Sequence, residues 1–236
     1  MITIIAIDAS TIACSVALLY GYNNNYSIIG CYEIINKKQM YKIIPMVNIL
    51  LYKAGINIKK IDCIAYGKGP GSFTGIKIAS SIAQGLALGV DCPLFAISTL
   101  EAIALNAWHK YNVKYIISII NNTLNQVLFL SLFKINNKFI LPLPIISKNI
   151  FFLKNKKECF FLKKILDNLI KKNFFFMGSG LYILNTIKIN TSIINMIDIN
   201  CEPDAAYIVR IAAKLFLSGS FNKLSFLEKL PCYLYI

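Results

Sequence analysis

The sequence has a single histidine, His109, and its seven cysteines are scattered without a Cys-x-x-Cys pair. Metal centres in proteins are typically built from several His and Cys ligands at short spacing, so we predict no metal site. A Ser-His-Asp or Cys-His arrangement would have to use His109, which lies beside Trp108 near the expected end of a helix. We interpret His109 as a surface or capping residue and predict no catalytic residue.

Acidic residues are also few. Twenty-five Lys and Arg stand against 11 Asp and Glu, which gives a formal net charge of +14. Such an excess favours contact with a polyanion such as RNA. The lysines fall in doublets such as Lys163-Lys164, however, and solvated lysines on helix faces have the same appearance. The charge therefore leaves both interpretations open.

The chain is apolar, with 56% hydrophobic residues and a mean hydropathy of +0.59, yet it has little that is typical of a membrane protein. The long charge-free stretch between Lys114 and Lys134 has asparagines and a glutamine at its centre, where a bilayer tolerates them least. The N-terminus lacks the basic start and small-residue cleavage site of a signal peptide. We expect a cytoplasmic protein with reduced cysteines and no membrane partner.

Hydrophobic periodicity predicts alternating strands and helices in the first half of the chain. Gly55 is typical of the C-terminal stop of the first helix. The expected strands cover residues 3–7, 14–20, 26–35, 61–66 and 94–98, and the expected helices cover residues 40–54, 76–89 and 99–109. This alternation predicts a mixed sheet with crossover helices.

The second half repeats the same order more loosely. Its expected strands cover residues 115–120, 127–133 and 174–176, and its expected helices cover residues 158–172 and 204–218. The order strand pair, helices, strand and glycine loop occurs twice in the chain. This repetition indicates a duplicated α/β fold of two lobes. We place the lobes at residues 1–110 and 111–236, with the helix at 204–218 able to pack back on the first lobe.

A glycine-rich stretch, residues 67–75, follows a predicted strand and precedes a helix, an arrangement whose free N–H groups suit an anion. Neither of the common glycine-rich phosphate patterns fits it. A tight structural turn therefore remains the alternative to an anion site. The candidate anion-binding residues are Asp8, Ser10, Gly69, Gly71, Ser72 and Thr74.

The helix behind this loop has no charged residue from Ile78 to Val90. Gly75, Ala79 and Ala83 begin a stripe of small residues that would let another backbone come close. A helix that is apolar on every side is either fully buried or shared with a partner. At about 14 residues we expect it to be too short to cross a bilayer.

Several segments of the first half resemble the TsaB family, which belongs to the TsaD/Kae glycoprotease-like superfamily. The glycine stretch and its flanks read AYGKGPGSFTGIKI, and the first strand reads IAIDAST. Ile44-Pro45-Met46-Val47 and Ser98-Thr99-Leu100 also match. The resemblance is dense over the first 108 residues and thin beyond them.

This resemblance implies a two-lobe Hsp70/actin/sugar-kinase-like (ASKHA) fold with a duplicated ribonuclease-H-like motif. It also implies a non-catalytic subunit that works with a TsaD-like catalytic subunit and a TsaE-like ATPase. Together they attach threonylcarbamoyl to the adenosine 3′ of the anticodon in tRNAs that read codons beginning with A. ATP, metal and threonylcarbamoyl-adenylate are expected at the partner subunits, with no cofactor on this chain alone, and tRNA is expected to bind indirectly or weakly. A homodimer is the alternative assembly when the chain is alone.

In the TsaB family two helices of the first lobe form the partner surface, and they correspond here to residues 40–54 and 74–89. The implied interface residues are Tyr41, Ile44, Pro45, Val47, Asn48, Leu51, Gly75, Ala79, Ile82, Ala83 and Leu86. The family's second-lobe motif, Ile-Asp-Ala-Arg-x-x-Glu-Val-Tyr, is altered here at residues 120–128, where both acids and the base are missing.

Three other functions remain to be weighed against the scaffold. One is an independent ATP-dependent phosphotransferase of the same fold, in which Asp8 would act beside metal-bound phosphate. Another is an RNA-binding module, which the net charge favours. The third is a metalloprotease, and the single histidine argues against it.

Overall fold

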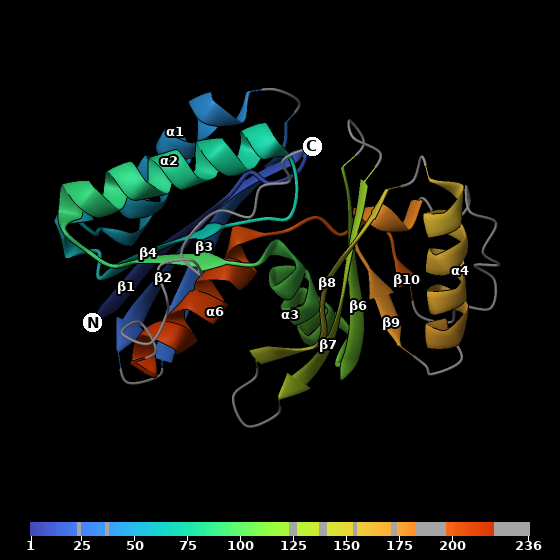
Figure 1. Ribbon diagram of the computed structural model, residues 1–236. Helices are drawn as coiled ribbons and strands as arrows, with labels where there is room; N and C mark the ends of the chain where they lie inside the picture. Colours follow the sequence, from blue (N-terminus) through green and yellow to red (C-terminus); the bar gives the residue numbers. More distant parts are fainter. Residues whose placement is uncertain are drawn as a thin grey trace. The chain divides into compact units, whose positions relative to one another are not determined.

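The computed structural model describes residues 1–22, 25–35, 38–122, 127–136, 141–152, 155–170, 174–182 and 197–219. The chain forms two compact units, shown in Figure 1. The first unit contains residues 1–102 and the segment from Pro203 onward, and the second contains residues 103–202. The division therefore falls between residues 102 and 103, near the start of helix α3 (Thr99–Tyr111), whereas we placed it at 110/111, near the end of that helix. Helix α6 (Ala205–Leu217) belongs to the first unit.

The first unit is built on a five-stranded sheet of order β3-β2-β1-β4-β5. Its strands are β1 (Ile2–Asp8), β2 (Ala13–Tyr22), β3 (Asn25–Ile34), β4 (Cys63–Gly67) and β5 (Leu94–Ile97). The first three strands form an antiparallel meander, while β4 and β5 run parallel to β1. The sheet is mixed, as the periodicity predicted.

Helices cover both faces of this sheet (Figure 1). On one face, α1 (Gln39–Ala54) and α2 (Phe73–Val90) pack over Ile5 and Ile7 of β1. Because side chains alternate along a strand, Ile4 and Ala6 face the opposite side, where α6 packs on β1, β2 and β4. Burial on both faces explains why β1 is a continuous apolar run instead of an alternating one.

The second unit repeats the topology of the first. Its sheet has the order β10-β9-β6-β7-β8 and comprises β6 (Tyr115–Asn122), β7 (Val127–Asn136), β8 (Leu141–Phe152), β9 (Phe175–Met177) and β10 (Ile197–Asp198). Again three strands form a meander and two run parallel to the first of them. Helix α4 (Lys156–Ile170) occupies the same place in the chain order as α1. The predicted two-lobe, duplicated fold is confirmed.

Strand β8 was not predicted from the sequence, since Pro142 and Pro144 interrupt its apolar pattern. Proline cannot donate to a sheet ladder and is confined to edge strands and strand ends. β8 is the edge strand of its sheet, so both prolines are tolerated there. Two short 3-10 helices, η1 (Ile58–Lys60) and η2 (Ser179–Tyr182), were also not predicted.

Helix α2 is 18 residues long, and the expectation that it is too short to cross a bilayer is wrong. By length and composition alone it is the one helix of the described residues that could span a membrane. Its inner face, however, lies in the core of the first unit, where Ile76, Ala79 and Ala83 are fully buried. One side of α2 therefore packs in the core of the first unit.

Candidate functional site

The glycine loop between β4 and α2 packs directly on the connection between β1 and β2. A Cβ atom at Gly71 would overlap the carbonyl oxygen of Ser10, and one at Gly75 would overlap that of Ala9. A Cβ at Gly67 would overlap the Asp8 carboxylate. Glycine is therefore required at these positions because of close approach within the chain itself.

Much of the polar backbone of this loop is already bonded inside the first unit. The Ser72 N–H donates to the Ser10 carbonyl at 2.5 Å, and the Gly75 N–H donates to Ser72 Oγ at 3.4 Å. Thr99, at the start of α3, donates its N–H to the Gly69 carbonyl and its hydroxyl to the Pro70 carbonyl. The N–H groups of Ser72 and Gly75 are thus engaged rather than directed at a bound anion.

Asp8 and Ser10 lie next to this loop and are both fully buried. The Ser10 N–H and hydroxyl donate to one carboxylate oxygen of Asp8 at 3.2 and 3.0 Å. Asp8, Ser10, Gly71 and Ser72 therefore lie together, and of the six predicted anion-site residues only Ser72 and Thr74 reach the surface. The structure has the geometry of the tight turn, and the anion site stays a prediction.

Glu101, in the first turn of α3, is a titratable group near this loop that the sequence analysis missed. Burial raises the pKa of its carboxyl to about 7, and the Lys68 ammonium opposes that rise. An acid two residues after Thr99 is also an ordinary first-turn residue of a helix, so its burial could not be predicted from the local pattern. Its side chain is half-buried.

Part of the predicted partner surface faces inward, and for these residues the prediction is wrong. Val47 and Leu51 of α1 pack into the core of the first unit. Ala79 and Ala83 of α2 are also in that core, and Gly75 is buried against Ala9. The small residues bring α2 close to its own sheet rather than to another protein. The sequence pattern indicated the stripe of small residues on α2, but it did not indicate that the stripe faces the core.

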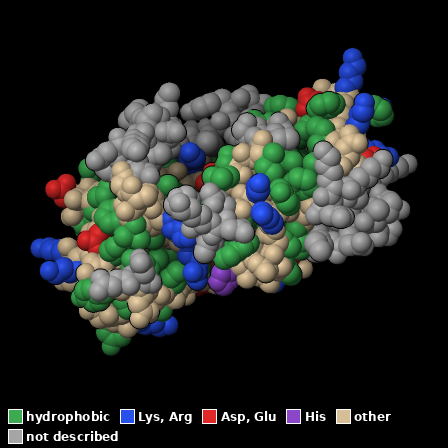
Figure 2. Space-filling model, turned by 90° about the horizontal axis from the view of Figure 1, so that it is seen from below, with side chains coloured by type: hydrophobic (Ala, Val, Ile, Leu, Met, Phe, Trp, Pro, Cys, Tyr) green, Lys and Arg blue, Asp and Glu red, His purple; other side chains and the backbone are tan. Residues whose placement is uncertain are grey.

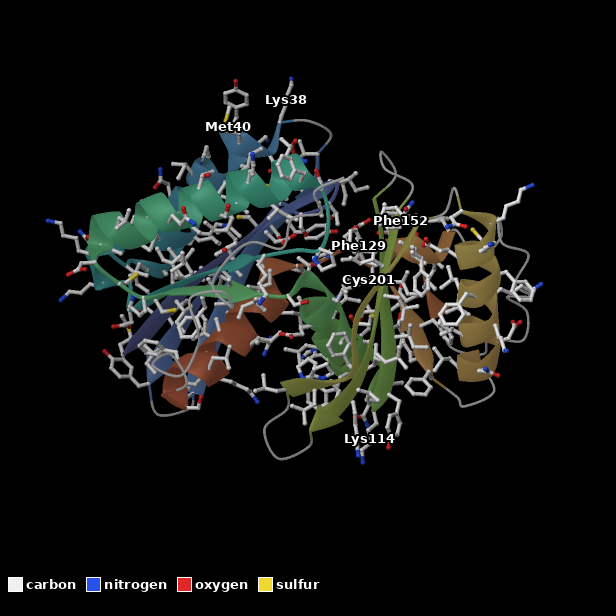
Figure 3. The ribbon with its side chains drawn as sticks, viewed as in Figure 1. Lys38, Met40, Lys114, Phe129, Phe152 and Cys201 are labelled. Carbon is white, nitrogen blue, oxygen red and sulfur yellow. The ribbon has the colours of Figure 1, made fainter. Side chains whose placement is uncertain are left out.

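The other face of α1 is exposed and largely apolar. Tyr41 exposes 70% of its surface, and Tyr52, which the sequence analysis did not select, exposes 89%. We call Tyr41, Ile44, Pro45, Asn48 and Tyr52 the α1 outer stripe, because their spacing places them on one side of the helix. All five residues are exposed. Figure 3 shows Lys38 and Met40 projecting from the start of the same helix.

Helix α2 adds less to this outward surface. Ile82 and Leu86 are half-buried and pack against the core, so they are only partly available to a partner. Leu88 is 83% exposed and Phe73 is exposed at the start of the helix, with the Lys77 ammonium 4.2 Å from its ring centre. Neither Leu88 nor Phe73 was predicted, because the stripe of small residues that indicated an interface lies on the inner face of α2.

The remaining predictions concern charge, metals and the second lobe. On the described part of the face in Figure 2, Lys and Arg side chains occur singly and in small groups. Among the described residues no group of three or more His, Cys, Asp or Glu could hold a metal ion. His109 contacts the neighbouring Trp108 ring edge-to-face, with ring centres 6.3 Å apart. Residues 123–126 of the altered motif lie outside the described residues.

Comparisons with known proteins converge on one group. The family model of TsaD, tRNA N6-adenosine threonylcarbamoyltransferase, matches residues 33–231. Two proteins named tRNA threonylcarbamoyladenosine biosynthesis protein TsaB are similar to the chain. The one from Haemophilus influenzae is 38% identical over 128 residues, 54% of this chain and 52% of that protein. The one from Escherichia coli is 40% identical over 124 residues, 52% of each.

These alignments span about half the length of the curated relatives. A solved structure covers more of the chain. YeaZ from Pseudomonas aeruginosa superposes with a TM-score of 0.78 over 99% of this chain and 100% of that one, at 24% sequence identity. At this identity the likeness is one of fold.

Proposed function

The chain belongs to the TsaD family, with TsaB proteins among its relatives, and from this membership we propose that it is a non-catalytic partner subunit in the synthesis of threonylcarbamoyladenosine in tRNA. Its main partner is a TsaD-type catalytic subunit, and a TsaE-type ATPase joins the assembly. ATP, metal and threonylcarbamoyl-adenylate bind at those subunits. The assembly works in the cytoplasm on the adenosine 3′ of the anticodon.

The α1 outer stripe is the observation that carries this proposal. The inner face of α1 is fully used in the core of the first unit, so the exposed tyrosines and Ile44 do not serve that unit's packing. Tyrosine is enriched in protein interfaces because it combines a large apolar ring with a hydroxyl group. None of the five stripe residues is charged. A partner that covers the stripe therefore removes no charged side chain of the stripe from water.

The closed glycine loop supports a scaffold rather than an independent ATP-dependent phosphotransferase. An enzyme of that kind presents free N–H groups and a carboxylate to a metal-bound phosphate. Here the Ser72 N–H is bonded to the Ser10 carbonyl, and the Asp8 carboxylate is buried and accepts two hydrogen bonds from Ser10. The phosphotransferase is therefore the less favoured function.

Co-expression with the TsaD-type subunit of the same genome tests the proposal. The variant Ile44→Glu with Tyr52→Glu places two charges on the stripe without touching the core. We expect at least a hundredfold loss of affinity for the catalytic subunit, since each central hot-spot residue of an interface contributes about 2 kcal/mol or more and the variant alters two of them. Ala83→Arg is unsuitable, because the fully buried Ala83 leaves no room for an arginine inside the first unit.

Leu217→Glu is the matched control, since Leu217 is also exposed but ends α6 in the same unit. It should co-purify as the unaltered chain does, and circular dichroism should show all variants folded. If the Ile44→Glu, Tyr52→Glu variant still co-purified with the catalytic subunit, the proposed interface would be wrong. Size-exclusion chromatography of the isolated chain tests the homodimer, which should also be lost in this variant if it uses the same stripe.

A further inference from the structure

Helix α4 of the second unit exposes two phenylalanines between two lysines. Phe160 and Phe161 expose 73% and 59% of their surface, while the adjacent Leu162 is fully buried. Lys157 stands about one turn before the pair and Lys164 one turn after it, and both are exposed. We call Lys157, Phe160, Phe161 and Lys164 the α4 outer face.

Helical geometry places these four side chains on one stripe. Positions separated by three, four and seven residues lie on the same side of an α-helix. The two lysines are separated by roughly 10 Å along the axis, with the aromatic rings between them. The opposite side of α4 is already occupied, since Leu166 and Leu169 are buried in the core of the second unit.

The stability of the helix does not account for the outer face. An exposed phenylalanine removes little apolar surface from water, and a lysine in the first turn is repelled by the positive end of the helix dipole. The first turn is held by other residues: the Asn155 side chain accepts the Lys157 N–H, and the Glu158 carboxylate accepts the Phe152 N–H. Among the described residues, neither the Lys157 nor the Lys164 ammonium forms an ion pair.

Aromatic rings flanked by cations match the chemistry of unpaired nucleotides. Unstacked bases stack on phenylalanine rings, and lysines neutralise the adjoining phosphates. We propose that the α4 outer face binds single-stranded RNA, with Phe160 and Phe161 stacking on bases and Lys157 and Lys164 contacting phosphates. The net charge of +14 favours approach of the same polyanion.

A membrane surface fits α4 less well. An interfacial helix buries a broad apolar face among the lipid headgroups, but the leucines of α4 are already buried in the second unit. Two phenylalanines remain, and the exposed Asp167 and Asn168 lie two turns further along the same side. These two polar side chains limit the outward apolar surface of α4 to the two phenylalanines, which is less than an interfacial helix buries.

The identity of the RNA as tRNA rests on the proposed function, whereas binding of unpaired nucleotides does not. The isolated full chain is titrated into a fluorescein-labelled oligouridylate and into an unmodified tRNA transcript, at 50 to 200 mM salt, with fluorescence anisotropy as the readout. Phe160→Ala with Phe161→Ala should weaken binding about tenfold or more. Lys157→Gln with Lys164→Gln should lower the slope of log affinity against log salt by about 1.4, or about 0.7 for each phosphate contact.

Matched controls carry the same chemical changes elsewhere. Tyr22→Ala removes an exposed aromatic ring from β2, and Lys59→Gln with Lys60→Gln removes two exposed lysines from η1. Both should bind RNA as the unaltered chain does, and thermal unfolding monitored by circular dichroism should show all variants folded. If the α4 variants and the controls lost RNA affinity equally, the proposal would be wrong. It would also be wrong if the unaltered chain bound neither the oligouridylate nor the tRNA transcript.

Vesicles of phosphatidylglycerol and phosphatidylcholine separate the membrane alternative. If the phenylalanine variant loses vesicle binding and keeps RNA binding, α4 is a lipid surface and the proposal is wrong. The α4 variants should still co-purify with the TsaD-type subunit. Intact co-purification with no RNA binding would refute only this inference, whereas RNA binding without co-purification would refute only the scaffold.

Discussion

The two units have the same strand order and the same strand directions, yet corresponding places carry different chemistry. In the first unit the glycine loop after β4 packs on the polar residues Asp8 and Ser10, with Glu101 nearby. In the second, Gly178 and Gly180 follow β9 and pack on the apolar Ile119. Close approach of glycines to the first strand of the sheet, or to the residues just after it, is thus common to the two units, while the side chains that surround the glycines differ.

The corresponding helices differ in the same way. α1 presents the uncharged α1 outer stripe, whereas α4 presents phenylalanines between lysines. Both helices bury leucines or other aliphatic residues beneath them. The duplicated fold therefore presents two outward helix faces of different chemistry, and the two proposals above rest on that difference.

The largest expected effect tests whether the two glycine loops are equally constrained. Gly75→Ala and Gly178→Ala each drive a Cβ into a carbonyl oxygen, of Ala9 and Ile119 respectively, and Gly178 also has a positive φ of 123°. Each should lower the free energy of unfolding by about 3 kcal/mol or more. Gly85→Ala, where the Cβ meets open space, should raise it by about 0.5–1 kcal/mol.

Urea denaturation of the three variants measures these changes. A Gly75→Ala protein as stable as the unaltered chain would show that the loop can move away from β1. The Gly85→Ala protein serves as the control, because it makes the same chemical change on the outer face of α2.

The next effect tests whether the polar surroundings of the first loop make stability depend on pH. Between about pH 4.5 and 7 the folded chain retains a proton on Glu101 that the unfolded chain releases. The free energy of unfolding therefore falls as pH rises through this interval, by about 2 kcal/mol after allowance for screening by solvent. Burial of Asp204 also raises the pKa of its carboxyl and acts in the same direction.

Glu101→Gln removes the first of these contributions. Urea titrations at pH 5 and pH 8 should show a smaller difference between the two pH values in this variant than in the unaltered chain. An identical difference in both proteins would show that Glu101 remains ionised in the folded state.

A smaller effect compares the starts of α1 and α4. Asn155 accepts the Lys157 N–H at 3.0 Å, whereas Lys38 before α1 makes no side-chain cap. Asn155→Ala should lower the free energy of unfolding by about 1 kcal/mol, and Lys38→Ala should change it by less than about 0.5 kcal/mol. Thermal denaturation followed by circular dichroism would detect the difference, and equal losses would argue against the cap.

The smallest effect concerns the two outward faces themselves. Tyr52→Ser in α1 and Phe161→Ser in α4 should each change stability by less than about 0.5 kcal/mol, since both side chains are exposed. A loss above 1 kcal/mol, measured by urea denaturation, would mean that the side chain packs within the folded chain. The corresponding face would then be a poor candidate for a partner.

Much of the fold was predictable because local patterns carry it. Strand and helix periodicity located the elements of the first sheet, and Gly55 marked the end of α1, where it adopts a left-handed conformation with φ of 65°. β8 was missed because its prolines suppress the strand pattern, and β10 because it has only two residues. Of the α1 residues that the family resemblance implied as interface, the structure exposes Tyr41, Ile44, Pro45 and Asn48 but buries Val47 and Leu51.

The sequence by itself determined which side chains share a face of each helix, since that follows from 3.6 residues per turn. It could not determine which face turns inward. Small residues allow close packing against any backbone, and only the tertiary structure showed that Ala79 and Ala83 lie on their own sheet. The burial of Glu101 and the closure of the glycine loop on Ser10 were likewise decided by contacts between segments far apart in the chain.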